Sequence, residues 1–88
     1  MQLARFLNKL FKKDGFILVD GYSKKYIIGQ PKNKIPITIK ILDKKLHYKL
    51  LFRPDLYFGE AYCDGNIIIE NGTLIDFLDL TLFNLGRN

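Results

Sequence analysis

Apolar residues near the start of the chain recur at helical spacing. Residues 2–13 read QLARFLNKLFKK, and the basic residues fall opposite one apolar stripe. That stripe follows the i, i+3, i+4, i+7, i+8 pattern and consists of Leu3, Phe6, Leu7, Leu10 and Phe11. Asp14-Gly15 comes next, and glycine commonly ends a helix. The pattern predicts an N-terminal amphipathic helix over residues 2–13.

Four short segments have the character of strands. Residues 16–20 (FILVD) and 25–29 flank a Gly-Tyr-Ser-Lys turn, which predicts a hairpin. Residues 35–42 alternate isoleucine with threonine and lysine, as a half-buried strand does, and Pro36 suggests a strand end or a sheet edge. Residues 66–70 (NIIIE) are closed by Asn71-Gly72 and form the fourth predicted strand.

Two further helices have start and stop signals. Asp43 can cap a short helix over residues 44–52, and Pro54 should end it. Thr73 can cap a last helix over residues 74–85, which Gly86 should stop. This last helix is apolar on most sides, so we expect it to meet a second surface, either another subunit or a domain that follows Asn88.

These elements predict one small α+β domain that covers residues 1–88. It has an N-terminal amphipathic helix, about four short and mostly antiparallel strands, one short middle helix and a C-terminal apolar helix. A chain of 88 residues has room for one domain at most, and its 48% of apolar residues suffice for a thin core.

Charge is distributed unevenly along the chain. Residues 1–53 carry 13 lysines and arginines against three aspartates, whereas residues 54–88 carry one arginine against six acids. This asymmetry favours an anionic partner for the first part. A composition rich in lysine, isoleucine and asparagine is equally explained by an AT-rich genome, without any function.

Residues able to perform catalysis are scarce. His47 is the only histidine and has no suitable partner at helical spacing other than Asp43, so we interpret it as a surface or partly buried side chain. The single Cys63 fits packing better than nucleophilic chemistry and suits a reducing, cytoplasmic setting. No glycine-rich nucleotide loop follows a strand. We therefore expect no catalytic, cofactor-binding or metal site in this chain.

The segment 59–65 (GEAYCDG) allows two interpretations. It could be a ligand or docking loop in which Glu60 and Asp64 are the polar anchors beside Gly59, Tyr62 and Gly65. On the residues alone we favour the other interpretation, a tight structural turn whose glycines take positive φ angles and whose carboxylates bind nearby backbone N–H groups.

The first helix also allows two interpretations. A basic face beside a Phe/Leu face is typical of helices that lie in a membrane interface, but the same stripe could simply pack on the sheet. The candidate membrane-facing residues are Arg5, Phe6, Lys9, Leu10, Phe11, Lys12 and Lys13. Nucleic-acid binding ranks below both, because arginine is scarce and no RNA-binding strand or loop motif is present.

Residues 46–84 carry a recognisable series of motifs. A leucine pair, Leu50 and Leu51, precedes the pattern P-x-L-x-x-GE-x-Y-x-DG, then a short strand, then a leucine-rich helix. The matching residues are Leu50, Leu51, Pro54, Leu56, Gly59, Glu60, Tyr62, Asp64, Gly65, Leu74, Leu78 and Leu80. With the strands upstream, nearly the whole chain resembles the N-terminal domain of the cyclopropane-fatty-acyl-phospholipid synthase family, which includes the mycolic acid cyclopropane synthases.

The resemblance implies a longer enzyme. A methyltransferase domain that binds S-adenosylmethionine and acts on phospholipid acyl chains would follow Asn88, and none of its cofactor or active-site residues map onto this chain. We then expect a noncatalytic module with two partners, its own C-terminal catalytic domain and the phospholipid surface at the cytoplasmic face of the membrane. The alternatives are a stand-alone module that forms a homodimer and, third, a nucleic-acid-binding domain.

Overall fold

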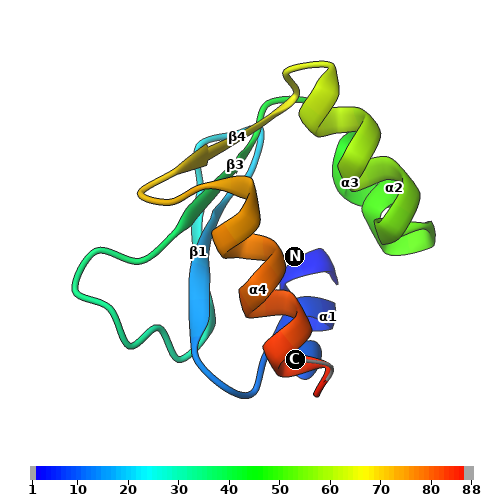
Figure 1. Cartoon of the computed structure of the whole chain (residues 1–88). Helices are drawn as coiled ribbons and strands as arrows, with labels where there is room; N and C mark the ends of the chain where they lie inside the picture. Colours follow the sequence, from blue (N-terminus) through cyan, green and yellow to red (C-terminus); the bar gives the residue numbers. More distant parts are fainter. Residues whose placement is uncertain (1, 87–88) are drawn as a thin grey trace.

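The computed structural model describes residues 2–86, except for the side chains of residues 47, 54 and 55, so the environment expected for His47 lies outside the described residues. The elements follow one another along the chain as shown in Figure 1. They are α1 (Gln2–Leu10), β1 (Gly15–Val19), β2 (Lys25–Gly29), β3 (Thr38–Ile41), α2 (Leu46–Phe52), α3 (Pro54–Cys63), β4 (Ile67–Glu70) and α4 (Leu74–Asn84).

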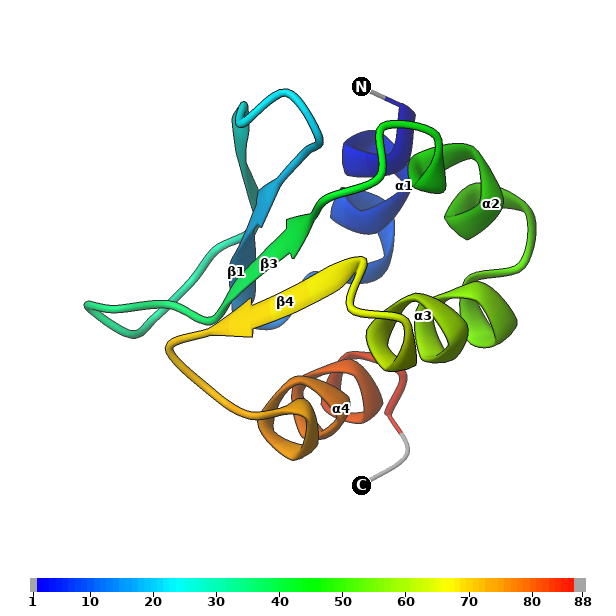
Figure 2. The ribbon, with the colours of Figure 1, turned by 90° about the horizontal axis from the view of Figure 1, so that it is seen from above.

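The four strands form one mixed sheet in the order β2-β1-β3-β4. β1 pairs with β2 and β3 pairs with β4 in antiparallel fashion, while the central pair β1–β3 is parallel. Figure 2 shows that the helices lie on one side of this sheet. The fold is therefore α+β, as the sequence predicts, and the predicted hairpin is β1–β2.

Two glycines allow the hairpin to close against the end of α1. Gly15 lies opposite Gly29, and a Cβ atom on Gly15 would collide with the carbonyl oxygen of Ile28. Gly29 has a φ of 68°, which is favourable only without a side chain, and its N–H donates to the Asn8 side chain at 2.8 Å. This contact ties α1 to the edge strand β2.

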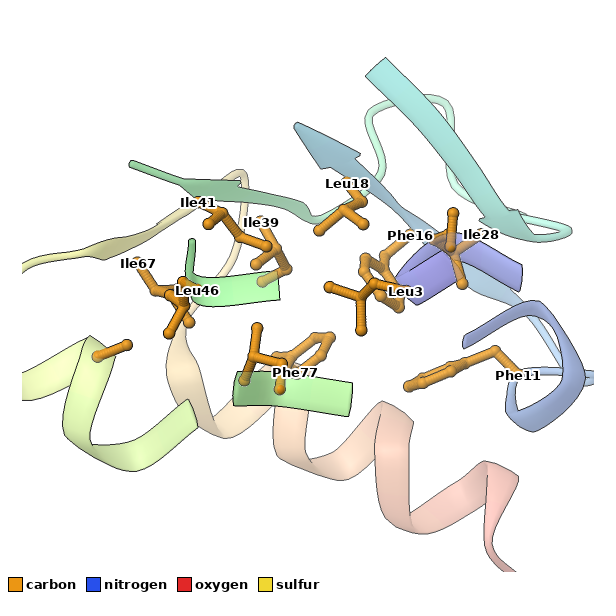
Figure 3. Close-up of a cluster of buried hydrophobic side chains, with 13 residues drawn as sticks. Leu3, Phe11, Phe16, Leu18, Ile28, Ile39, Ile41, Leu46, Ile67 and Phe77 are labelled. Atoms are coloured by element: carbon orange, nitrogen blue, oxygen red, sulfur yellow. The ribbon is translucent and has the colours of Figure 1, made fainter. Parts of the chain in front are cut away.

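The core lies between the sheet and the helices. Alternate residues of the strands point inward, as the period of two in a strand requires. The other sheet face is exposed at Ile27 and Ile68, although Val19 of β1 is buried. Figure 3 shows this cluster, whose labelled members are Leu3, Phe11, Phe16, Leu18, Ile28, Ile39, Ile41, Leu46, Ile67 and Phe77. The helices contribute Leu3, Leu46 and Phe77, and Phe11 follows directly after α1, so every layer of the fold reaches the same core.

Some element ends differ from those predicted. α1 ends at Leu10 rather than at residue 13, because Phe11 turns into the core and Asp14 adopts a φ of 65°. Asp43 does not cap α2 directly. Its carboxylate accepts the N–H of Lys45 at 2.9 Å, one residue before the helix begins. β3 covers only Thr38–Ile41 of the predicted strand 35–42.

Candidate functional site

An apolar cleft opens between α1 and α4. It has a volume of about 330 Å³, and its floor is the inward face of the sheet. Leu7 and Leu10 of α1 form one wall, Leu78 and Leu85 belong to the α4 side, and Phe58 of α3 adds a further part of the wall. Among its lining residues Thr81 is the only one with a polar side-chain atom, and the Thr81 hydroxyl already donates to the Phe77 carbonyl at 2.9 Å. The cleft therefore suits an apolar occupant.

An exposed apolar stripe on α4 continues the cleft onto the surface. Four residues at positions i, i+3, i+7 and i+10 share one side of the helix. They are Ile75, Leu78, Leu82 and Leu85, and each is at least 40% exposed. Leu78 and Leu85 also line the cleft, and Phe6 of α1, 38% exposed, lines it from the opposite side. The cleft and the stripe together form one apolar surface, called the α1–α4 surface below.

Phe77 holds α4 over the core. Its ring lies parallel to the ring of Phe58, with centroids 5.3 Å apart, and edge-on to the ring of Phe16, with centroids 5.0 Å apart. It also stacks with Phe11 at 6.2 Å. Figure 3 shows Phe77 reaching from α4 towards the sheet. Phe77 is the one buried residue of α4, and Leu78 and Thr81 beside it line the cleft.

Both ends of α4 are fixed by polar contacts. At its start, Thr73 and Asp76 form a capping box, with the Asp76 N–H donating to the Thr73 hydroxyl at 3.1 Å and the Thr73 N–H donating to the Asp76 carboxylate at 2.9 Å. Near its end, Asn84 accepts the backbone N–H of Lys13 at 2.7 Å, and the Lys13 ammonium lies 5.3 Å from the centre of the Phe83 ring. The contacts of Lys13 with Asn84 and Phe83 therefore join the end of α4 to the segment that follows α1.

The residues expected to face a membrane on the first helix do not form one lipid-facing group. Phe11 is 1% exposed and belongs to the core, and Leu10 is half-buried in the wall of the cleft. Arg5, Lys9 and Lys12 are exposed, and Phe6 is partly exposed at the cleft. Lys13 is exposed beside Phe83. Most of the predicted apolar stripe therefore packs on the fold, whereas Phe6 and the basic residues stay exposed.

The segment 59–65 is neither a loop nor a tight turn over most of its length, because residues up to Cys63 belong to α3. Gly59 lies inside this helix, with no neighbouring atom within 4 Å of where a Cβ would lie. Only Gly65 has the positive φ expected of a turn glycine, 79°, just after the helix ends. Glu60, Tyr62 and Asp64 are on the exposed side, while Ala61 faces the core.

None of the described acidic or thiol side chains lines the cleft. None of the described groups of histidine, cysteine, aspartate and glutamate could hold a metal ion, and Cys63 is an exposed free thiol. A polar hollow of about 540 Å³ lies beside α4, and its acidic members are Asp14, Asp76 and Asp79. Asp14 and Asp76 already accept backbone N–H groups.

Sequence reasoning missed a second surface, at the β1–β2 turn and the start of α2. Tyr22 is 71% exposed there, and the Lys44 ammonium lies 4.7 Å from the centre of its ring. Partial burial raises the pKa of Asp20, but hydrogen bonds from the N–H groups of Lys24 and Tyr22 outweigh this effect and hold the pKa below its usual value. The signal for this surface was Tyr48 and Phe52, which are spaced four apart in a predicted helix.

Comparison with known proteins gives no family: no family model matches the chain, and no curated protein matches it significantly. Separately, no helix within residues 2–86 is both long enough and apolar enough to cross a membrane.

Proposed function

We propose that this domain is a noncatalytic docking module that braces a catalytic domain through the α1–α4 surface. The observation that carries the proposal is the apolar cleft of about 330 Å³, which opens directly onto core side chains. Apolar surface left in water costs about 25 cal/mol per Å². A partner that fills the cleft and covers the exposed stripe of α4 therefore gains binding energy without any conformational change in the sheet.

The resemblance supplies the identity of the partner. The segment that resembles cyclopropane-fatty-acyl-phospholipid synthases also builds much of the cleft, since Leu50, Phe58, Ile67, Phe77 and Leu78 all line it. In that family a methyltransferase domain follows the N-terminal domain. We propose that such a domain is the partner, that it binds S-adenosylmethionine with its own residues, and that the two work together at the cytoplasmic face of the membrane.

Binding between separately expressed parts tests this proposal. The 88-residue chain is titrated by calorimetry into a methyltransferase domain of the cyclopropane synthase type, and amide chemical shifts map the contact. We expect Leu78→Asp with Leu82→Asp to weaken binding more than tenfold, because each substitution places a charge in an apolar contact. Ile27→Asp is the matched control, since Ile27 is 66% exposed on the open face of the sheet.

The outcome against the proposal is equally defined. Binding that survives the α4 substitutions, or that is lost equally with the Ile27 control, would place the contact elsewhere.

The same double substitution also separates docking from self-association. If the 88-residue chain forms a dimer in light scattering and the α4 variant is a monomer, the homodimer is the correct interpretation of the α1–α4 surface. The exposed stripe favours such a dimer, but Asp76 and Asp79 add like charges to each copy of the helix.

A further inference from the structure

The three most exposed aromatic rings of the described chain lie on two neighbouring segments. Tyr22 in the β1–β2 turn is 71% exposed, and Tyr48 and Phe52 on α2 are 63% and 79% exposed. Aromatic rings normally avoid water to this degree, because each carries a large apolar area. Their concentration in one region therefore indicates a contact surface.

The two segments are in contact. A Cβ atom on Gly21 would lie 2.9 Å from the Cα atom of Lys44, just before α2, so the turn packs directly on the chain that leads into the helix. Tyr48 and Phe52 are four residues apart and lie one turn above the other on the exposed side of α2. Figure 2 shows the β1–β2 turn and the start of α2 together, on the side of the molecule away from α4.

Three exposed lysines lie on the same stretch of chain as these rings. The Lys44 ammonium lies over the Tyr22 ring, Lys45 comes directly before α2, and Lys49 lies on α2 with its ammonium 5.8 Å from the centre of the Tyr57 ring. The nearby acids, Asp20 and Asp43, turn their carboxylates towards local backbone N–H groups. The result is an aromatic–lysine face made of six residues. They are Tyr22, Lys44, Lys45, Tyr48, Lys49 and Phe52.

We propose that this aromatic–lysine face binds the surface of an anionic phospholipid bilayer. Lysine ammonium groups attract acidic head groups, and tyrosine and phenylalanine rings at the same level enter the boundary between head groups and acyl chains. Single-stranded nucleic acid, the other polyanion, is held in a groove where bases stack and arginine contributes. None of the six residues lines either hollow described above, and none is an arginine.

The face goes beyond the docking function and uses different residues. In α1, where the sequence predicted lipid contact, Leu3, Leu7 and Leu10 pack against the core, and Phe6 stays partly exposed beside the cleft. The β1–β2 turn and the start of α2 lie on the opposite side of the ribbon from α4 (Figure 2), so the proposal allows a bilayer and a catalytic domain to be bound at the same time. Loss of one contact would leave the other intact, which keeps the two proposals separately testable.

Cosedimentation with vesicles tests the face. The 88-residue chain is spun with vesicles of phosphatidylcholine alone or with one third phosphatidylglycerol, at low and high salt. We expect binding only to the anionic vesicles, fading with salt. Lys45→Glu with Lys49→Glu should lower the partition coefficient about tenfold or more. Lys32→Glu with Lys34→Glu is the matched control, because it changes the net charge equally in the exposed loop before β3.

A fluorescence probe gives an independent readout. The chain has no tryptophan, so Phe52→Trp introduces a single reporter at the most exposed ring. Its emission should shift to the blue with anionic vesicles, whereas the emission of an Ile27→Trp variant, with its reporter on the open sheet face, should not shift.

Four results would each overturn the proposal. Two come from the charge variants. Vesicle binding could fall equally in the Lys45/Lys49 variant and in the Lys32/Lys34 control, or it could fall only in a variant with Arg5→Glu and Lys9→Glu on α1. The third is an emission spectrum of the Phe52→Trp variant that anionic vesicles leave unshifted. The fourth is salt-sensitive binding to oligonucleotides without binding to vesicles.

Discussion

The ring of Phe77 meets the ring of Phe16 edge-on, with their centroids 5.0 Å apart and their planes at 86°. Through this contact α4, the last helix of the domain, is anchored to β1, a central strand of the sheet. Phe77 is the one buried residue of α4, and it also lines the cleft, so the same side chain packs on the core and borders the open space.

Removing the Phe77 ring should release α4. Phe77→Ala deletes contacts with three other rings, and we expect the free energy of unfolding in urea to fall by about 3 kcal/mol. Ile75→Ala, on the same helix but 64% exposed, should change it by less than about 0.5 kcal/mol. Similar losses in the two variants would mean that Phe77 does not anchor the helix.

The start of α4 depends on its capping box. Thr73→Ala removes the hydroxyl that accepts the Asp76 N–H, and we expect a loss of about 1 kcal/mol in the free energy of unfolding. Thr73→Ser keeps the hydroxyl and should retain most of the stability. If Thr73→Ser and Thr73→Ala lower the free energy of unfolding equally, the stabilisation comes from the methyl group of Thr73 and not from the capping hydrogen bond.

The ends of helices and strands could be predicted from the sequence where a local residue pattern favours a single backbone conformation. Strand β2 was predicted to the residue, and the cap at Thr73 and the stop at Gly86 follow from local chemistry. α3 was missed because its residues have no apolar period and Gly59 interrupts them. The signal was present all the same: Pro54 occupies the first turn, where proline is favourable, and Gly65 follows the last turn with a positive φ.

Two glycine substitutions distinguish the helix from a loop. Gly59→Ala should raise the free energy of unfolding by about 0.5–1 kcal/mol, because Gly59 lies inside α3 with open space around it. Gly65→Ala should lower it by about 1 kcal/mol, since its φ of 79° disfavours a side chain even though no atom is close. Urea unfolding of both variants measures this. A destabilising Gly59→Ala would indicate a turn at that position.

The candidate surfaces were predicted less well than the elements. The surplus of apolar residues on α4 predicted that the helix meets a partner surface, which stays a prediction, and Ile75 and Leu82 are exposed on that helix. The cleft itself depends on the distance between α1 and α4, which no local pattern contains. Likewise, the parallel pairing of β1 with β3 and the contact of Gly21 with Lys44 join residues far apart in sequence.

Asp20 should make the stability depend on pH at the acid end. Hydrogen bonds from the β1–β2 turn hold its pKa below the usual value in the folded chain. A lowered folded pKa stabilises the fold above the unfolded pKa, and this contribution is lost as the pH falls below about 4. Asp20→Asn should therefore reduce the difference in stability between pH 7 and pH 3, two values on either side of the usual aspartate pKa of about 4. Asp79→Asn, which removes one exposed charge on α4, is the control, and an equal effect from it would exclude the turn as the cause.

Filling the cleft should separate its role in docking from its role in folding. Leu7 is half-buried in the α1 wall of the cleft, and Leu7→Phe replaces it with a larger side chain that would fill part of the 330 Å³ volume. Because the added ring gains apolar contacts there, we expect the isolated domain to become more stable by about 0.5–1 kcal/mol in urea. The same variant should bind the methyltransferase domain more than tenfold more weakly, since the partner's side chains would find the space occupied.

The matched control is Leu42→Phe, which makes the same change at a residue that is 51% exposed and outside the cleft. It should alter neither stability nor docking. A Leu7→Phe variant that is more stable and still docks normally would show that the cleft is only a packing defect. A variant that gains stability while losing its partner would establish that this domain leaves core surface open in order to bind.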